Sequence, residues 1–182
     1  MDIKKTKLKG VFILKNQVFQ DERGLFCKTY HYEFFKNNNI CNNFKESYYS
    51  VSKKNVIRGM HFQLPPFDHD KLVYVPRGEV LDVILDLRKD SDTYGEYIEV
   101  NLSGENRLSV YIPKGLAHGF KSLKDNTITI YNVSTVYKQE SDSGVRWDSF
   151  GMNWNIKNPI VSSKDKGLVE FNNFDSPFYI WR

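Results

Sequence analysis

The sequence predicts an all-β protein, built as a closed or double-sheet antiparallel roll of the jelly-roll type. Aromatic residues are abundant, with 13 Phe, 11 Tyr and 3 Trp in 182 residues, and such rings favour pleated, half-buried surfaces. Short runs of β-branched and aromatic residues follow one another along the chain. Turn sequences such as "LSGEN" and "PKG" separate these runs at intervals typical of a sandwich or barrel.

These runs are the expected strands, and they cover residues 9–14, 24–32, 71–76, 79–88, 96–102, 107–113, 118–123 and 127–137. The run 79–88 alternates most clearly, because Asp82 and Asp86 share one face while the opposite face is wholly apolar. We therefore expect this strand to carry both aspartates on a polar face. Helix signals are weak, and only residues 31–39 are expected to form about two helical turns.

Length and composition restrict the class of protein. A chain of 182 residues is the size of one domain, and we expect a single domain over residues 1–182. The formal net charge of +4 is spread along the chain, which suits a small anionic ligand such as a diphosphate as well as nucleic acid. Cys27 and Cys41 are too few for a disulfide framework. No apolar run approaches a membrane span, so we expect a cytoplasmic protein without a membrane partner.

The histidines raise the possibility of a metal site. His118 lies in "PKGLAH", which resembles the second half of the metal-binding signature of cupins. The first half of that signature has a second histidine two positions after the one matched by His61, and this chain has Gln63 there. Asp68 or His69 would have to complete a set of three ligands. Because the set is incomplete, we expect no metal and no other cofactor.

A second candidate chemistry is proton transfer next to a carbonyl group. It requires a base on one face of the substrate, an acid on the other face if configuration inverts, and a cation where the enolate oxygen develops. Histidine titrates nearest to neutral pH, so His61, a tyrosine and Lys71 form a plausible set, with Asp165 fixing the imidazole tautomer. Taken singly, these residues also have ordinary interpretations as a satisfied core histidine, a solvated lysine and strand tyrosines.

Several motifs together resemble one known family. In chain order they are "DERGLF", "KKNVIRGMHFQ", "KLVYVPRGEVLDVILDLRKDSDTYGEY", "NLSGEN", "IPKGLAHGF" and "WDSFGMNW". Their order and spacing, from about Gly10 to Lys166, are similar to those of the dTDP-4-dehydrorhamnose 3,5-epimerase family. The resemblance implies a metal-free cupin jelly roll with minor short helices, usually a homodimer. It also implies a nucleoside-diphosphate 4-keto-6-deoxy sugar as substrate, in the supply of deoxysugars for capsule, O-antigen or glycosylated metabolites.

The resemblance implies roles for individual residues as well. His61 matches the general base, Asp165 its partner, and Tyr131 the tyrosine that returns a proton from the opposite face. Lys71 matches the lysine near the C4 oxygen, where enolate charge builds. The substrate-binding positions are Arg23 and Arg58, which would hold the diphosphate, together with Phe19, Glu46, Gln63, His118 and Tyr137.

Three positions depart from the family pattern. Members that take dTDP typically have Glu, Gln and Asn where this chain has Lys28, Glu46 and Tyr48. A carboxylate at position 46 can accept two hydrogen bonds from guanine, whereas thymine offers one ring donor. The sequence is therefore compatible with a GDP-linked hexose or heptose as well as with a dTDP-linked sugar. The alternative interpretation is that Glu46 lies in a surface loop whose sequence has drifted. Inversion at C3 alone is also open, although we expect inversion at C3 and C5.

Other classes of function stay open at this point. A non-catalytic cupin that binds sugar nucleotides should tolerate loss of the acid or the base, and this chain has lost neither. A metal-dependent cupin dioxygenase predicts stoichiometric iron in the purified protein. A nucleic-acid partner has no motif support and predicts a steep salt dependence of binding. We therefore expect an isomerase that epimerises a nucleotide sugar.

Overall fold

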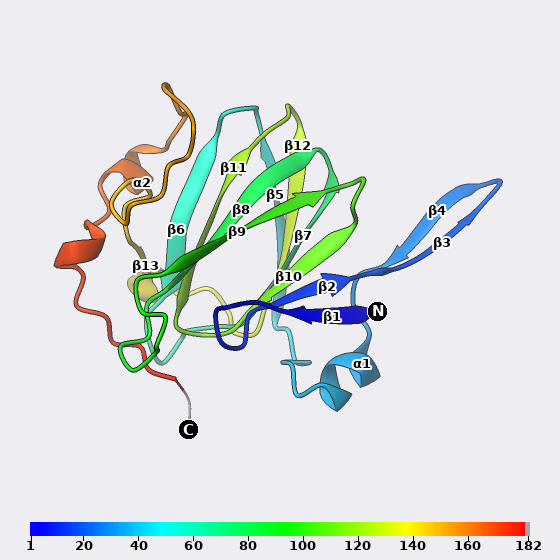
Figure 1. Cartoon of the computed structure of the whole chain (residues 1–182), viewed down its shortest axis with the longest axis horizontal. Helices are drawn as coiled ribbons and strands as arrows, with labels where there is room; N and C mark the ends of the chain where they lie inside the picture. The colour runs from blue at the N-terminus through cyan, green and yellow to red at the C-terminus, as the bar shows by residue number, and fades with distance from the viewer. Residues whose placement is uncertain (181–182) are drawn as a thin grey trace.

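The computed structural model describes residues 1–180, and the strands form two stacked antiparallel sheets (Figure 1). One sheet contains, in spatial order, β1 (Asp2–Lys5), β2 (Phe12–Lys15), β10 (Leu108–Ile112), β7 (Lys71–Arg77), β12 (Thr127–Val133) and β5 (Glu46–Ser52). The other contains β13 (Asp142–Gly144), β6 (Ile57–Gln63), β11 (Leu116–Ser122), β8 (Glu79–Asp86) and β9 (Tyr97–Ser103). We call them the six-stranded and the five-stranded sheet. The last two residues of the predicted domain lie outside the described residues.

The order of the strands confirms the predicted double-sheet β roll. Neighbouring strands within both sheets are antiparallel. From β5 to β8, and again from β9 to β13, successive strands alternate between the two sheets. This alternation is what brings residues that are far apart in the sequence to the same interior space.

The helices are short and cover the edges of the roll. They are α1 (Tyr32–Asn37) and α2 (Ser163–Lys166), with single 3-10 turns η1 (Gln139–Ser141) and η2 (Phe171–Asn173). The first confirms the helix expected within residues 31–39, and His31 caps it by accepting a hydrogen bond from the Phe34 N–H at 3.3 Å. Phe35 of α1 is fully buried against Leu72 of the six-stranded sheet.

Both faces of β8 and β11, at the centre of the five-stranded sheet, are buried. Ile84 and Phe120 face the interior between the sheets, where they meet Val110 of the six-stranded sheet. Their neighbours in sequence face outwards and are covered by the C-terminal segment, whose Trp154 and Phe178 belong to a second apolar cluster. In Figure 1 this segment runs alongside β6 and β13. The central strands β8 and β11 therefore have no solvent-exposed face.

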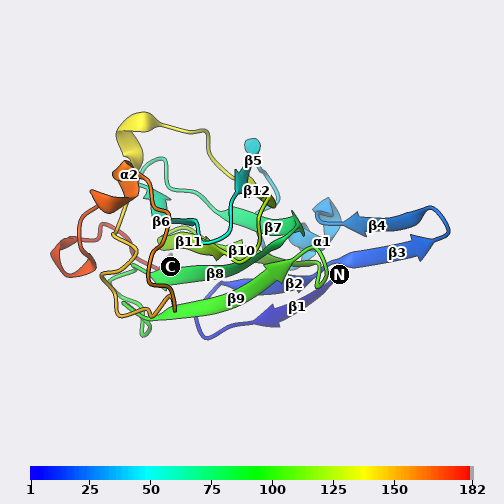
Figure 2. The same ribbon diagram turned by 90° about the horizontal axis from the view of Figure 1, so that it is seen from above.

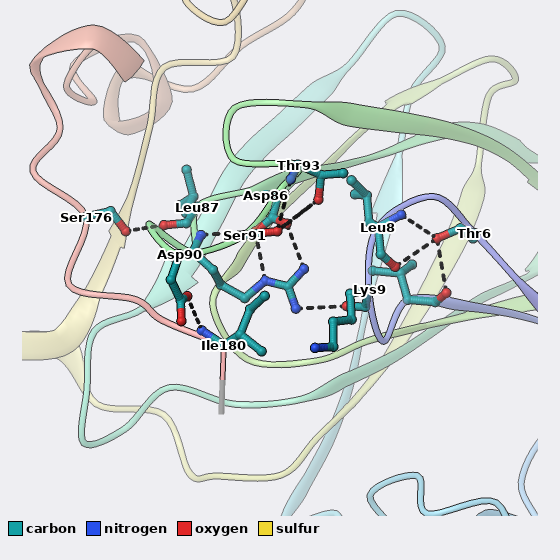
Figure 3. A network of polar contacts seen from close by, with 12 residues as sticks. Thr6, Leu8, Lys9, Asp86, Leu87, Asp90, Ser91, Thr93, Ser176 and Ile180 are labelled. Carbon is teal, nitrogen blue, oxygen red and sulfur yellow. Dashed lines mark hydrogen bonds and ion pairs between the residues drawn. The ribbon is translucent and has the colours of Figure 1, made fainter. Parts of the chain in front are cut away.

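The predicted polar face of β8 is consequently wrong. Asp82 and Asp86 are both fully buried, and each has found a polar partner instead of water. Asp86 accepts hydrogen bonds from Ser91 Oγ at 2.7 Å and Thr93 Oγ1 at 2.8 Å (Figure 3). It also pairs with the Arg88 guanidinium at 2.7 Å. Burial opposes ionisation of Asp86, but the bonds from Arg88 and Ser91 outweigh it and lower the pKa of this carboxyl.

A hairpin of β3 (Gln17–Asp21) and β4 (Gly24–Lys28) projects from the body of the roll (Figure 1). The view from above shows the same projection (Figure 2). Its apolar side chains are open to solvent, with Phe19 52% and Phe26 61% exposed. An isolated two-stranded hairpin has marginal stability in water, so these exposed rings mark a surface suited to further contact.

The sequence placed several elements well and missed others. The expected strand 24–32 ends at Lys28, because the chain turns into α1, and the expected strand 127–137 ends at Val133. The strands that were not among the expected ones are β1, β3, β5, β6 and β13. Cys27 and Cys41 are free thiols. Within residues 1–180, no helix has the length and apolar character that a membrane crossing requires.

Candidate active site

A cavity of about 380 Å³ is bounded by strands of both sheets. β5, β7 and β12 contribute from the six-stranded sheet, and β6 and β13 contribute from the five-stranded sheet. The predicted site residues that line this cavity are His61, Lys71, Glu46, Gln63 and Tyr137. Their sequence positions span residues 46–137, so the alternation of strands between the sheets is what assembles them.

His61 forms a dyad with Asp165, as expected. The imidazole Nε2 lies 2.8 Å from Asp165 Oδ1, and the His61 side chain is 33% exposed while that of Asp165 is 5% exposed. Asp165 is held by the first turn of α2, where the Ser162 hydroxyl accepts a hydrogen bond from its N–H at 3.0 Å. An Nε2–H that donates to a carboxylate leaves Nδ1 with a free lone pair, which is the form a general base requires.

The charge state of Asp165 suits this role. Burial opposes ionisation, but the hydrogen bond and charge of His61 outweigh it and lower the pKa of the carboxyl. The Gly59 N–H also donates to Asp165 Oδ2 at 3.2 Å. Asp165 is therefore an ionised group at neutral pH that fixes the tautomer and the orientation of the imidazole.

The backbones of β6 and β11 are in close contact next to the dyad. Gly59 has φ +134°, and a Cβ atom there would lie 2.5 Å from the Gly119 Cα. A Cβ on Gly119 would lie 2.7 Å from the Arg58 carbonyl oxygen. Both glycines are therefore required by the backbone, because neither position has room for a side chain.

Lys71 is a buried ammonium at the start of β7. It is 6% exposed, and its Nζ donates to the His61 carbonyl oxygen at 3.0 Å. Burial lowers its pKa to about 8, while the carboxylates of Asp82 and Asp142 act in the opposite direction. At neutral pH the side chain is mainly charged, and it supplies a desolvated cation beside the base.

His118 lies directly opposite His61 in the register of β11 and β6. Residues opposite each other on antiparallel strands project to the same face, so both imidazoles face the interior. His118 Nε2 lies 2.7 Å from Asp82 Oδ2, and burial raises the pKa of Asp82 against the effects of His118 and Lys71. Asp82 Oδ1 has no hydrogen-bond partner within residues 1–180. The aspartate that we assigned to a polar strand face is therefore part of the site.

Tyr131 of β12 belongs to the opposite sheet. Its ring lies edge-on to His118 at 6.0 Å and stacks on Tyr48 at 5.1 Å between centroids. Its hydroxyl lies 3.4 Å from the Ser50 hydroxyl. Burial raises the pKa of Tyr131, which keeps the phenol protonated and able to act as an acid. Tyr48 is among the residues that line the cavity, and Tyr131 lies beside Tyr48 on the neighbouring strand.

Hydrogen bonds link the groups at the edge of the cavity to one another. Glu46 Oε1 accepts from the Tyr137 N–H at 3.0 Å. The Tyr137 hydroxyl donates to Asp142 Oδ2 at 3.1 Å, and the Lys164 ammonium pairs with the same oxygen. The Tyr137 side chain is 56% exposed, so its ring presents a free aromatic face. Asp142 and Lys164 were not singled out from the sequence.

Gln63 lines the cavity, but its amide is already engaged. Its Nε2 donates to the Phe67 carbonyl at 2.8 Å, and its Oε1 accepts from the Lys138 N–H at 2.7 Å. These bonds hold two loops together beside the site. His69 lies 3.3 Å from the same amide, and burial together with the charge of Lys71 lowers its pKa to about 3. His69 is therefore neutral and too weak a base to take the role assigned to His61.

Four predicted binding residues do not line the cavity within one chain, namely Phe19, Arg23, Arg58 and His118. Arg58 bonds to Ser52 Oγ at 3.1 Å, and its charge acts on Tyr131. Phe19 and Arg23 sit on the projecting hairpin, where they line a different hollow. The Arg23 side chain is 86% exposed and pairs with Asp21. One chain does not bring Phe19 or Arg23 to the dyad.

The sequence contains only a faint signal for the residues that it missed. Asp82 belongs to an alternating strand, and alternation gives no sign that its face is enclosed. Asp142 and Lys164 sit outside the regular strand runs, although Lys164 directly precedes Asp165. Within residues 1–180, no three His, Cys, Asp or Glu side chains are grouped to hold a metal ion.

The arrangement separates a base from an acid. The His61–Asp165 dyad is attached to the five-stranded sheet, whereas Lys71 and Tyr131 belong to the six-stranded sheet. A planar carbonyl compound held between the sheets meets an imidazole on one side and a phenol on the other, next to a buried cation. Such a set can move protons at carbon atoms beside a ketone.

Comparison with known proteins also indicates an epimerase. The family model described as dTDP-4-dehydrorhamnose 3,5-epimerase matches residues 5–173. A dTDP-4-dehydrorhamnose 3,5-epimerase from Methanothermobacter thermautotrophicus is 43% identical over 181 residues, covering 97% of this chain and 96% of the relative. A dTDP-6-deoxy-D-glucose-3,5-epimerase structure from Legionella pneumophila, in complex with dTDP-4-keto-L-rhamnose, has a TM-score of 0.92 at 32% identity and covers 98% of both chains.

A second solved relative agrees. The dTDP-4-dehydrorhamnose 3,5-epimerase of Bacillus anthracis, with TDP and PPi bound, has a TM-score of 0.90 at 35% identity and covers 93% of this chain and 98% of that chain. The fold and the matches define an epimerase of the cupin jelly-roll class. The chain belongs to the dTDP-4-dehydrorhamnose 3,5-epimerase family, because the family model matches nearly its whole length.

Proposed function

We propose that this chain inverts C3 and C5 of a dTDP-linked 4-keto-6-deoxy hexose. The observation that carries the proposal is the position of the His61–Asp165 dyad on one sheet, with Lys71 and Tyr131 on the other. The ligands named for the relatives, dTDP-4-keto-L-rhamnose and TDP, support a dTDP-linked substrate. Location in the cytoplasm stays a prediction.

The reaction at each carbon uses three side chains. His61 Nδ1 takes the proton from the carbon next to the ketone, and the C–H electrons move into the C4 carbonyl to give an enolate. The Lys71 ammonium stabilises the oxygen on which that charge develops. Tyr131 then gives a proton to the opposite face of the carbon, so the configuration inverts. Exchange with solvent returns the proton balance of His61 and Tyr131 to its starting state.

The nucleotide is the finer part of the proposal. The guanine hypothesis required both oxygens of Glu46 to be free for the base. Glu46 Oε1 already accepts the Tyr137 N–H at 3.0 Å, so the geometry favours one ligand bond at this side chain rather than two. This argues for dTDP over GDP. Calorimetric titration with dTDP and GDP tests the choice, and tighter binding of GDP would reverse it.

The proposal includes a homodimer in which the hairpin of each chain serves the other chain. Arg23 is matched to diphosphate binding, yet it lies on a hairpin that projects from the body of the roll (Figure 2) and does not line the cavity. The exposed rings of Phe19 and Phe26 on that hairpin are apolar surface suited to a protein contact. A two-fold dimer would give each cavity an Arg23 and a Phe19 from the second copy.

Exchange in deuterated water tests the activity directly. The purified protein is incubated with the dTDP-4-keto-6-deoxy sugar, and NMR follows deuterium at C3 and C5 together with the configuration of both centres. Deuterium and inversion at both carbons are expected. Inversion at C3 alone would restrict the proposal to a C3 epimerase, and exchange at neither carbon in a folded protein would refute it. The matched control is His61→Ala, which should abolish exchange.

A further inference from the structure

Tyr48 is in direct ring contact with Tyr131, the candidate acid. It lies on β5 directly opposite Tyr131 of β12. Directly opposed residues of antiparallel strands project to the same face. The two rings are stacked, with centroids 5.1 Å apart and ring planes at 24°.

Tyr131 is held from two sides. The Tyr48 ring covers one side, and the His118 ring meets it edge-on at 6.0 Å. Of the two stacked phenols, Tyr48 lines the cavity together with His61 and Lys71. Tyr48 thus packs beside Tyr131 on the same face of the sheet, and its ring restricts the plane that the Tyr131 phenol can adopt.

The chemistry of Tyr48 itself fits a steric role. Burial and the carboxylates of Glu46 and Asp142 raise the pKa of Tyr48 to about 12, so its phenol stays neutral at working pH. The Tyr48 hydroxyl has no hydrogen bond to Tyr131, whose hydroxyl lies next to Ser50 instead. The contact between the two tyrosines is therefore made by the rings.

We propose that Tyr48 is a positioning residue for inversion: its ring fixes the Tyr131 phenol for proton delivery, and it plays no part in proton abstraction by His61. The inference rests on the proposed function and adds a determinant of its stereochemical outcome. An acid that is displaced by even a small distance loses much of its rate advantage, whereas the dyad belongs to the other sheet and keeps its geometry.

The test compares two rates in each variant. NMR in deuterated water measures deuterium wash-in with retention, which needs only the His61 side, and inversion, which needs Tyr131 as well. Tyr48→Ala should lower inversion about tenfold while wash-in changes less than about twofold. Tyr48→Phe keeps the ring and should behave as the unmodified protein. Tyr49→Ala is the matched control, because Tyr49 is the next residue of β5 and is 68% exposed.

A double-mutant cycle shows whether Tyr48 acts through Tyr131. In a Tyr131→Phe background, adding Tyr48→Ala should cause no further loss of inversion. Loss of inversion in Tyr48→Phe would make the Tyr48 hydroxyl the acid and overturn the inference. Equal loss of wash-in and inversion in Tyr48→Ala, or no loss of either, would overturn it too. Absence of wash-in in the unmodified protein would instead refute the proposed function.

Discussion

His61 and His118 lie opposite each other on β6 and β11, and each imidazole is bonded to a different buried carboxylate. The partner of His61 is Asp165, on a short helix near the C-terminus, and the partner of His118 is Asp82, on the neighbouring strand β8. Only the first of these imidazoles lines the cavity, since His118 is 3% exposed. Two similar dyads therefore lie in different surroundings, and only that of His61 can reach a ligand in the cavity.

Asp165→Asn should lower kcat at least about a hundredfold with little change in KM. Asp165 accepts from the imidazole N–H and from the Gly59 N–H with separate oxygens, whereas an amide has one acceptor oxygen and no charge. His61 then loses its fixed tautomer while the substrate contacts remain. Steady-state kinetics and deuterium wash-in measure the effect, and both should fall together. Ser162→Ala is the matched control, because it removes only the helix cap. An Asp165→Asn protein with near-normal wash-in would exclude the dyad from the base step.

The activity should depend on pH through Lys71. Its pKa lies near 8, below the ordinary value of 10.5, so the free enzyme loses this cation as pH rises through about 8. We expect kcat/KM to fall on the alkaline side with an apparent pKa near that value. In Lys71→Arg the residual activity should lack this limb, because a guanidinium stays charged. An unchanged limb in that variant would assign the titration to another group.

Lys71 should also cost stability, and the cost should depend on pH. The folded-state pKa is below the unfolded one, so the cost is fully present below about pH 8 and disappears as pH rises through 10.5. Lys71→Met should therefore raise the free energy of unfolding by about 1–3 kcal/mol at pH 7 and by little near pH 10.5. The lost bond to the His61 carbonyl offsets part of this gain.

Urea denaturation at both pH values measures the effect, and activity should be lost in the same variant. Lys121→Met is the control, because Lys121 is buried and donates to the Trp154 carbonyl, away from the cavity. It should keep activity and show no gain in stability at pH 7. A Lys71→Met protein that is less stable at pH 7 would mean that the ammonium is well compensated where it lies.

Mixing two inactive variants should restore activity if hairpins are exchanged. In a dimer of one Arg23→Ala chain and one His61→Ala chain, one cavity has both an intact base and an intact arginine, and the other has neither. Random reassortment should therefore return about one quarter of the unmodified activity. Each variant alone should be nearly inactive. Absence of recovery after verified subunit exchange would place Arg23 at the cavity of its own chain or outside the reaction.

The sequence allowed the roll, the short helix and the dyad to be predicted, because each depends on local patterns or on motifs. The run 79–88 shows where pattern reading fails: alternation predicted a polar face, but the C-terminal segment encloses one side of the sheet and the second sheet encloses the other. Asp82 and Asp86 then stay inside because His118 and Arg88 satisfy them. Partners supplied by distant strands cannot be read from a window of ten residues.

The hairpin and β5 show a second limit. Phe19 and Arg23 were matched to the site by motif, but the structure places them on the projecting β3–β4 hairpin. Within one chain they do not reach the cavity. β5 was not recognised because its run "ESYYSVS" is polar and forms the edge of its sheet. Tyr48 is important because Tyr131 lies opposite it on β12, and the register between these two strands sets that pairing.

The contact of Gly59 with Gly119 has a wider consequence. The main chains of β6 and β11 touch there, two residues from His61 and one residue from His118. Side-chain substitutions elsewhere therefore have little effect on the distance between the two imidazole rings. Lineages can thus rebuild the surface that reads the nucleotide, as positions 28 and 46 suggest, without changing the spacing of these two imidazoles. The fold therefore keeps the spacing of the two imidazoles constant, while the residues that contact the nucleotide are free to change.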